Sequence, residues 1–283
     1  MSSRSKEMIK RILVGLAGTA YTPVAIERAV TLAQTHAAEV TGVTVLDSHR
    51  VRSLSGAAPP PRDEVEAIHG SRRTITETRI AQSIRDFEVA CQTAGIKFRV
   101  AEESGDAFTS LVDLARYHDL MVFGLRSIFD YEFHAGDPES ILIRLVSAGV
   151  RPLVAVSETF HSISRVVIAY NGSMESAKAM KQFVQMRLWP GAELKIVTFH
   201  PSDSQALELL RAAEEYCRAH GFRVCHQSNT GDPKVLLLSA ATLWQADMIV
   251  MGNSARSVLL RKVLGDTLLA TLRDTQIPLF LSQ

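Results

Sequence analysis

An internal repeat is the feature of this sequence that most constrains its fold. Residues 11–19, RILVGLAGT, match residues 165–173, RVVIAYNGS, which lie 154 positions further along the chain. Further on, the Gly-Asp pair at Gly105 matches the Gly-Asp pair at Gly231, 126 positions later. The 283 residues are therefore predicted to hold two versions of one folding unit, with 28 more residues between these landmarks in the first repeat than in the second.

The additional residues of the first repeat are predicted to form a loop over residues 48–70. This stretch contains three consecutive prolines, beginning at Pro59. Proline fixes φ and removes a backbone donor, so a run of prolines disfavours both helix and sheet. We expect a mobile insertion here; a lid that docks over a site is the alternative.

Each repeat alternates short runs of Val, Ile and Leu with amphipathic stretches, a pattern typical of parallel strands buried between helices. The sequence thus predicts an α/β fold of two tandem doubly wound domains, each a five-stranded parallel sheet with helices on both faces. We place the boundary near residue 160, which gives domains of 1–160 and 161–283. Cys91 and Cys217 fall on equivalent apolar helix faces, so both are predicted to be buried.

The composition excludes several classes of protein. The sequence is 46% hydrophobic and carries 31 Lys and Arg against 30 Asp and Glu, a net charge of +1. This balance gives no electrostatic reason to expect nucleic acid or a membrane as a partner. No apolar run approaches the roughly 18 residues of a membrane span, so a cytoplasmic location is expected. Three cysteines without a CxxC pair predict neither a disulfide framework nor a structural zinc site.

The end of the second repeat carries the most specific pattern in the chain. Residues 246–267 read ADMIVMGNSARSVLLRKVLGDT, and an amphipathic stretch and the apolar run IPLFL at 277–281 follow them. In this order of elements the chain resembles the universal stress protein family. The resemblance implies five-stranded α/β domains related to adenine-nucleotide-binding folds. It also implies that the two domains pack as an intramolecular pseudo-dimer through residues 152–156 and 278–281, because single-domain members dimerise through their last strands.

ATP-binding members of that family carry the pattern G-x2-G-x9-G-[ST], and the second repeat matches it in part. Gly252 and Gly265 hold the first and third glycine positions, but Ala255 replaces the second glycine and Asp266 replaces the Ser or Thr. A methyl group limits how closely the backbone approaches a phosphate. The resemblance therefore implies weak binding of ATP or another adenine nucleotide in the second domain. The residues predicted to form this site are Asn171, Gly172, Ser173, Phe199, Gly252, Ala255, Arg256, Gly265, Asp266 and Thr267.

Asp266 and its counterpart Asp137 each open an amphipathic stretch and are predicted to be helix N-caps. A carboxylate at this position accepts hydrogen bonds from free backbone N–H groups and lies at the positive end of the helix dipole. The same groups would bind a phosphate, so a capping carboxylate competes with an anion. The alternative is that Asp266 holds a nucleotide through a magnesium ion.

The first repeat departs further from the family pattern. Ala17 stands at the position of Asn171, and the loop after Gly124 has no second glycine and is bulky and aromatic. No nucleotide is expected in the first domain, which resembles a degenerate partner domain.

No catalytic constellation emerges from the sequence. We expect a non-catalytic stress-response protein without a metal site, whose protein partners the sequence does not identify. Two alternatives remain open. One is an interaction scaffold that binds no nucleotide, and the other is an ATP-using enzyme of the related pyrophosphatase type, which the segment NGSMES at 171–176 distantly resembles.

Overall fold

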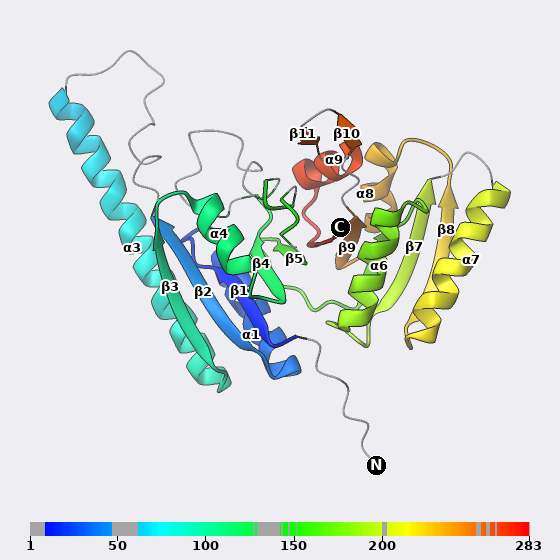
Figure 1. Cartoon of the computed structure of the whole chain (residues 1–283), viewed down its shortest axis with the longest axis horizontal. Helices are drawn as coiled ribbons and strands as arrows, with labels where there is room; N and C mark the ends of the chain where they lie inside the picture. The colour runs from blue at the N-terminus through cyan, green and yellow to red at the C-terminus, as the bar shows by residue number, and fades with distance from the viewer. Residues whose placement is uncertain are drawn as a thin grey trace.

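The structure, a computed structural model, describes residues 9–46, 62–126, 128, 142, 144–146, 148–150, 152–199, 203–252, 256–258, 261–263 and 265–282. Ten strands form one continuous sheet in the order β3-β2-β1-β4-β5-β12-β9-β6-β7-β8 (Figure 1). The first repeat supplies β1 (Arg11–Gly15), β2 (Glu39–Leu46), β3 (Phe98–Ser104), β4 (Leu120–Gly124) and β5 (Leu153–Val156). The second supplies β6 (Arg165–Ala169), β7 (Glu193–Phe199), β8 (Arg223–Asn229), β9 (Met248–Gly252) and β12 (Leu279–Ser282). A separate antiparallel ribbon consists of β10 (Arg256–Val258) and β11 (Arg261–Val263).

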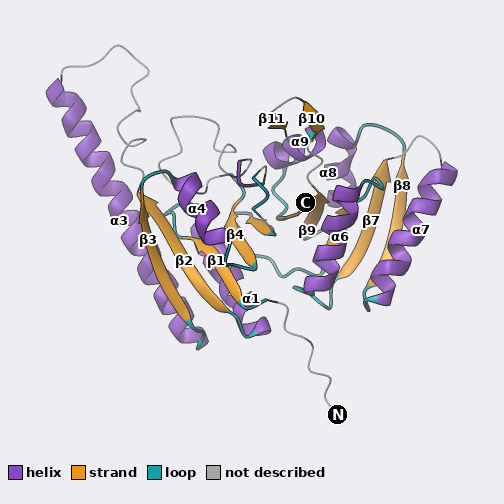
Figure 2. Ribbon diagram, viewed as in Figure 1, coloured by secondary structure: helices purple, strands orange, loops and turns teal. Residues whose placement is uncertain are grey.

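Helices cover both faces of the sheet (Figure 2). One face carries α1 (Thr22–His36), α3 (Arg62–Ala94), α6 (Met174–Met186) and α7 (Asp203–Ala219). The other face carries α4 (Ala107–Ala115), α8 (Pro233–Leu243) and α9 (Asp266–Asp274). Successive strand residues alternate between two apolar cores, one on each face, and both cores contain residues of both repeats. The predicted doubly wound α/β class, with a mostly parallel sheet and helices on both faces, is confirmed.

The two repeats meet at the centre of the sheet. Within the ten-stranded sheet, all strand pairs formed inside one repeat are parallel. In contrast, β5 pairs antiparallel with β12, with Val154 opposite Phe280. The segment 157–164 then connects β5 to β6. Because the hydrogen-bonded sheet is continuous, it contains no gap that marks a domain boundary, and the division near residue 160 stays a prediction.

The insertion in the first repeat is partly helical, which corrects the loop predicted over residues 48–70. Helix α3 begins at Arg62 and runs for 33 residues, whereas its counterpart α7 has 17. Residues 48–61 lie outside the described residues. After the prolines the sequence RDEVEA at 62–67 combines helix-forming residues with carboxylates in the first turn, which favour a helix start. The N-terminal end of α3 extends beyond the sheet in Figure 1.

The two equivalent cysteines are core residues, as predicted. Cys91 and Cys217 are both fully buried, one on α3 and one on α7. Burial raises the pKa of each thiol to about 12. Each is therefore a protonated, unreactive thiol at neutral pH.

The central strand pairing predicts a large effect of Phe280→Ala. The ring is fully buried and packs edge-on against Phe183 with a centroid distance of 5.3 Å. We expect the free energy of unfolding in urea to fall by about 3–5 kcal/mol, since a buried ring is lost and a cavity remains. Leu243→Ala is the control, because this side chain is 86% exposed and should change stability little. A loss for Phe280→Ala as small as that of the control would contradict the central placement of β12.

Candidate functional site

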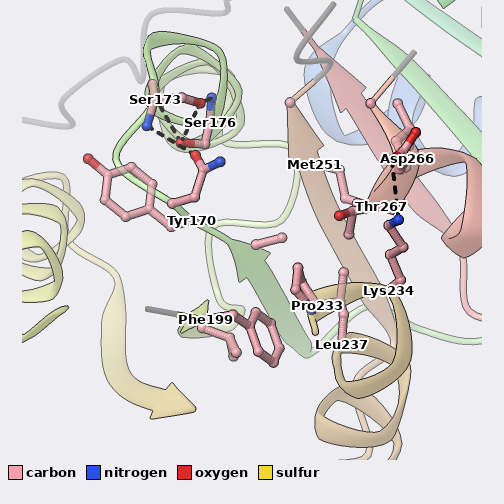
Figure 3. Close-up of a pocket in the computed structure, with 16 residues that line it drawn as sticks. Tyr170, Ser173, Ser176, Phe199, Pro233, Lys234, Leu237, Met251, Asp266 and Thr267 are labelled. Atoms are coloured by element: carbon pink, nitrogen blue, oxygen red, sulfur yellow. Dashed lines mark hydrogen bonds and ion pairs between the residues drawn. The ribbon is translucent and has the colours of Figure 1, made fainter. Parts of the chain in front are cut away.

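A pocket opens at the carboxyl ends of the central strands of the second repeat. The strand order reverses between β6 and β9, and ligands of doubly wound sheets bind in the crevice at such a point. The cavity has a volume of about 520 Å³, which suits a small organic ligand. Its lining comes from three strand ends and from the N-terminal ends of α6, α8 and α9 (Figure 3). The lining residues are Ala169, Tyr170, Asn171, Ser173, Ser176, Val197, Phe199, Pro233, Lys234, Leu237, Met251, Gly252, Gly265, Asp266, Thr267 and Leu268.

The structure brings most of the predicted site residues to this cavity. Those that line it are Asn171, Ser173, Phe199, Gly252, Gly265, Asp266 and Thr267. Gly172 lies in the turn between two of them without lining the cavity. Ala255 lies outside the described residues, and for Arg256 only the backbone, in β10, is described. A role of these residues in binding stays a prediction.

The turn between β6 and α6 is held by its own polar side chains. Asn171 Oδ1 accepts a hydrogen bond from the backbone N–H of Ser173 at 3.0 Å. Ser173 is the N-cap of α6, and its hydroxyl accepts from the N–H of Ser176 at 3.2 Å. Gly172 between them has φ of 78°, a left-handed conformation that glycine adopts without strain. The local sequence thus fixes where α6 begins and which polar groups face the cavity.

Gly252 is required by close packing of the chain. A Cβ atom built at this position would lie 2.4 Å from the carbonyl oxygen of Glu175 and 2.8 Å from the backbone nitrogen of Ser176. The first turn of α6 therefore lies directly against the end of β9. The glycine lets strand and helix approach closely, and this approach forms one wall of the cavity.

Asp266 does not cap its helix, which corrects the N-cap prediction. The N-cap of α9 is Gly265, with φ −61° and ψ 139°, and this residue has no side chain that could accept from the first N–H groups of the helix. Asp266 is the first helical residue, and its carboxylate instead forms an ion pair with Lys234 of α8, with 3.2 Å between Nζ and Oδ2. The N-cap residue of α9 therefore provides no side-chain cap, and the ammonium group of Lys234 is paired with a carboxylate. Asp137 lies outside the described residues.

An apolar wall faces this polar end, and sequence reasoning found only one of its members. The ring of Phe199 lies near Leu237 and Pro233 of α8 (Figure 3). Lys234, which lines the polar end of the cavity, is also absent from the site residues predicted from the sequence. A usable signal was present: Asp232 followed by a proline begins a helix directly after a strand, and the Asp232 side chain accepts from the N–H of Lys234 at 2.9 Å. A helix that starts after β8 starts at the same edge of the sheet as the ends of β6 and β9.

Comparison with known proteins identifies the family. The sequence model described as the universal stress protein family matches residues 8–128 and 199–282, which is more than half of the chain. The chain belongs to the universal stress protein family. A curated relative, the universal stress protein Slr1230 of Synechocystis sp., is 26% identical over 190 residues. That match spans 66% of this chain and 66% of the relative, so slightly less than two-thirds of the relative is covered.

Solved structures share the fold over nearly the whole chain. A universal stress protein from Archaeoglobus fulgidus matches with a TM-score of 0.65 at 18% identity, covering 96% of this chain and 98% of its own. A functionally unknown protein from Pseudomonas aeruginosa PAO1 matches with a TM-score of 0.59 at 15% identity, over 99% of this chain and 94% of its own. At these identities the likeness shows the fold, and it extends over both universal stress protein repeats.

The first universal stress protein repeat has apolar side chains after the corresponding strand ends. Ala17 is 3% exposed, and Leu125 and Ile128 are each 2% exposed. Tyr21, in the turn before α1, is buried as well. These residues belong to the core on the α4 face. In this repeat these four residues after β1 and β4 are thus part of the protein interior.

Two further properties concern the described residues. They contain no group of three or more His, Cys, Asp or Glu side chains placed to hold a metal ion. None of their helices combines the length and apolar character that crossing a membrane requires.

The close approach at Gly252 predicts that Gly252→Ala deforms the cavity. The added methyl meets backbone atoms of the α6 start, which no side-chain rotation relieves. We expect the free energy of unfolding to fall by about 1–3 kcal/mol, the usual range for overpacking. Gly191→Ala is the matched control, because a Cβ there meets nothing within 4 Å and the backbone is not left-handed. Equal stability of the two variants in urea titrations would show that Gly252 is not needed for close packing.

Proposed function

We propose that the second repeat binds an adenine nucleotide weakly and that the protein is a non-catalytic universal stress protein. The base would lie against Phe199 and Leu237, and the phosphate would lie toward the start of α9. The observation that carries the proposal is the uncapped start of α9, which lines the cavity together with Lys234.

The polar end of the cavity has the groups that an anion needs. The first N–H groups of a helix have no partner inside the helix, and the helix dipole adds positive potential there. Ser173 caps α6 and Asp232 caps α8, but Gly265 offers no side chain to cap α9. The start of α9 is therefore the one of these three helix ends where a phosphate would meet no competing side-chain cap.

The ion pair between Lys234 and Asp266 supports weak binding. The Asp266 carboxylate is 75% exposed and lies where phosphate oxygens would approach the start of α9. It repels an anion and also occupies the ammonium group that would otherwise attract one. A nucleotide must displace Lys234 from this carboxylate or bind beside a negative charge.

The lining of the pocket favours a binding role over catalysis. Among the described residues that line it there is no histidine or cysteine, and its one carboxylate is paired with Lys234. Among these described lining residues, no histidine, cysteine or unpaired carboxylate is available as a general base for an ATP-cleaving enzyme.

Titration calorimetry of the purified protein with ATP, ADP and AMP tests the proposal. We expect one nucleotide per chain, saturable binding, and no release of phosphate or pyrophosphate on prolonged incubation. Binding of none of the three would favour the interaction scaffold, and steady release of pyrophosphate would favour the pyrophosphatase-type enzyme.

The ion pair predicts that Asp266→Ser strengthens the binding of ATP. The substitution removes a negative charge and frees Lys234. Because both side chains are substantially exposed and screened by water, we expect a decrease in Kd of about threefold to tenfold rather than more. Asp274→Ser is the matched control, because this carboxylate lies at the other end of α9 and pairs with Arg273. If Asp266→Ser instead abolished magnesium-dependent ATP binding, Asp266 would be a metal ligand.

A further inference from the structure

Arg126 reaches from the first repeat to the end of a helix in the second. It is the second residue after β4, and its guanidinium group donates hydrogen bonds to three backbone carbonyls at the C-terminal end of α9. The donor-to-acceptor distances are 3.3 Å to Leu272 and 2.7 Å to Thr275, and the third acceptor is the carbonyl of Arg273. Residues 146 to 149 positions apart in the sequence are joined in this way.

These carbonyls are groups that α9 cannot satisfy by itself. The last four carbonyls of a helix have no partner within it, and the dipole concentrates negative potential at that end. At this end of α9 the N–H of Thr275 donates a hydrogen bond to the carbonyl of Thr271 at 2.9 Å. The guanidinium group donates to the next two carbonyls, those of Leu272 and Arg273, and its planar array of donors suits several acceptors at once. Arg126 thus acts as a C-terminal cap supplied by the other repeat.

Arg126 lies next to a buried phenol of its own repeat. The Tyr21 phenol interacts electrostatically both with the guanidinium group and with the Glu158 carboxylate. Burial, and next to it the Glu158 carboxylate, raises the pKa of the Tyr21 phenol, which is therefore uncharged at neutral pH. Tyr21 is 7% exposed, so its ring is part of the interior beside the guanidinium group.

The opposite end of α9 is a wall of the pocket. Gly265 and the first three residues of the helix line the cavity, and α9 has only 9 residues. A helix of this length is a rod of about 13 Å, so a shift at its C-terminal end moves its N-terminal end as well. Figure 1 shows α9 beside α8, which supplies Lys234. Any movement of α9 therefore changes how far its first residues lie from the lining residues on α8 and on the strand ends.

The sequence of the second repeat has no arginine at the corresponding position. The position in the second repeat that corresponds to Arg126 is Ser254, by the match of Gly124 with Gly252. A serine hydroxyl donates one hydrogen bond and cannot replace a guanidinium group.

We propose that Arg126 is a positioning residue for the pocket of the second repeat, through which the first repeat holds α9 in place. This inference rests on the proposed function for its effect on nucleotide affinity. It assigns a role to the repeat for which no nucleotide is expected: its loop after β4 supports the site of its neighbour.

The test combines amide hydrogen exchange of the full-length protein with titration of ATP. Arg126→Met keeps the length of the side chain but removes all donors. We expect the α9 amides to exchange about fivefold faster or more, while the β6 amides keep the wild-type rate. The Kd for ATP should rise about threefold to tenfold, the range of coupling that residues outside a site can exert. Arg126→Lys, which restores the charge and part of the donor set, should fall between Arg126→Met and the wild type.

Matched controls come from the same repeat. Arg116→Met removes an arginine that pairs with Asp113 on the surface at 3.1 Å, and it should behave as the wild type in both measurements. Tyr21→Phe removes the hydroxyl that lies beside Arg126 and should change both in the same direction as Arg126→Met, but less. Tyr117→Phe, at a residue that is 69% exposed, is its control and should have no effect.

Three results would overturn the inference. The first is unchanged exchange of the α9 amides in Arg126→Met. The second is faster exchange of α9 with unchanged affinity for ATP, and the third is an equal acceleration in β6, which would make Arg126 a general stabiliser. If the wild-type protein binds no ATP, the proposed function fails, and the exchange of the α9 amides then decides alone whether Arg126 holds this wall of the pocket.

Discussion

The antiparallel pairing of β5 with β12 joins the two repeats into one sheet, and both apolar cores depend on it. Every residue of the two strands is buried. Val154 and Phe280 face one core, while Leu153 and Leu279 face the other, so each core continues from one repeat into the next. Without this pairing each repeat would present an unpaired apolar strand edge to water. The helices on either face, the pocket walls and the contact of Arg126 with α9 all presuppose it.

The same strand order supports two different environments at the switch points. At the end of β6 the second repeat has a turn whose own side chain, Asn171, accepts one of its backbone hydrogen bonds. At the end of β9 it has Gly252, which allows a helix to pack closely against the strand. After β1 and β4 the first repeat places buried side chains such as Leu125, followed by Arg126 with its cross-repeat bonds. The second repeat has a cavity at this edge of the sheet, whereas the described residues at the same edge of the first repeat make internal contacts. The two repeats thus share one arrangement of strands. The residues at the strand ends determine whether that edge of the sheet lines a cavity or makes internal contacts.

Local patterns in the sequence predicted the features that depend on local geometry. Apolar runs without alternation gave the buried parallel strands, and helical spacing placed Cys91 and Cys217 in the core. Two glycines and the Asn171 turn led to residues that share one cavity. The pairing of Lys234 with Asp266 was not predictable in this way, because it joins residues 32 positions apart on different helices. The prolines at 59–61 predict a loop up to residue 70, but the helix-forming residues that follow them place the start of α3 at Arg62.

The place of β12 in the sheet has a consequence for how the chain is made. In sequence β12 follows all the other strands, and about 120 residues separate it from β5, its partner at the centre. At a synthesis rate of about 5–20 residues per second, roughly 6 to 25 seconds pass between the appearance of one strand and that of the other. During this interval the first repeat has its own sheet but an unprotected apolar edge, which is a template for pairing with other chains. A nascent chain of this protein is therefore exposed to aggregation from the appearance of β5 until β12 pairs with it.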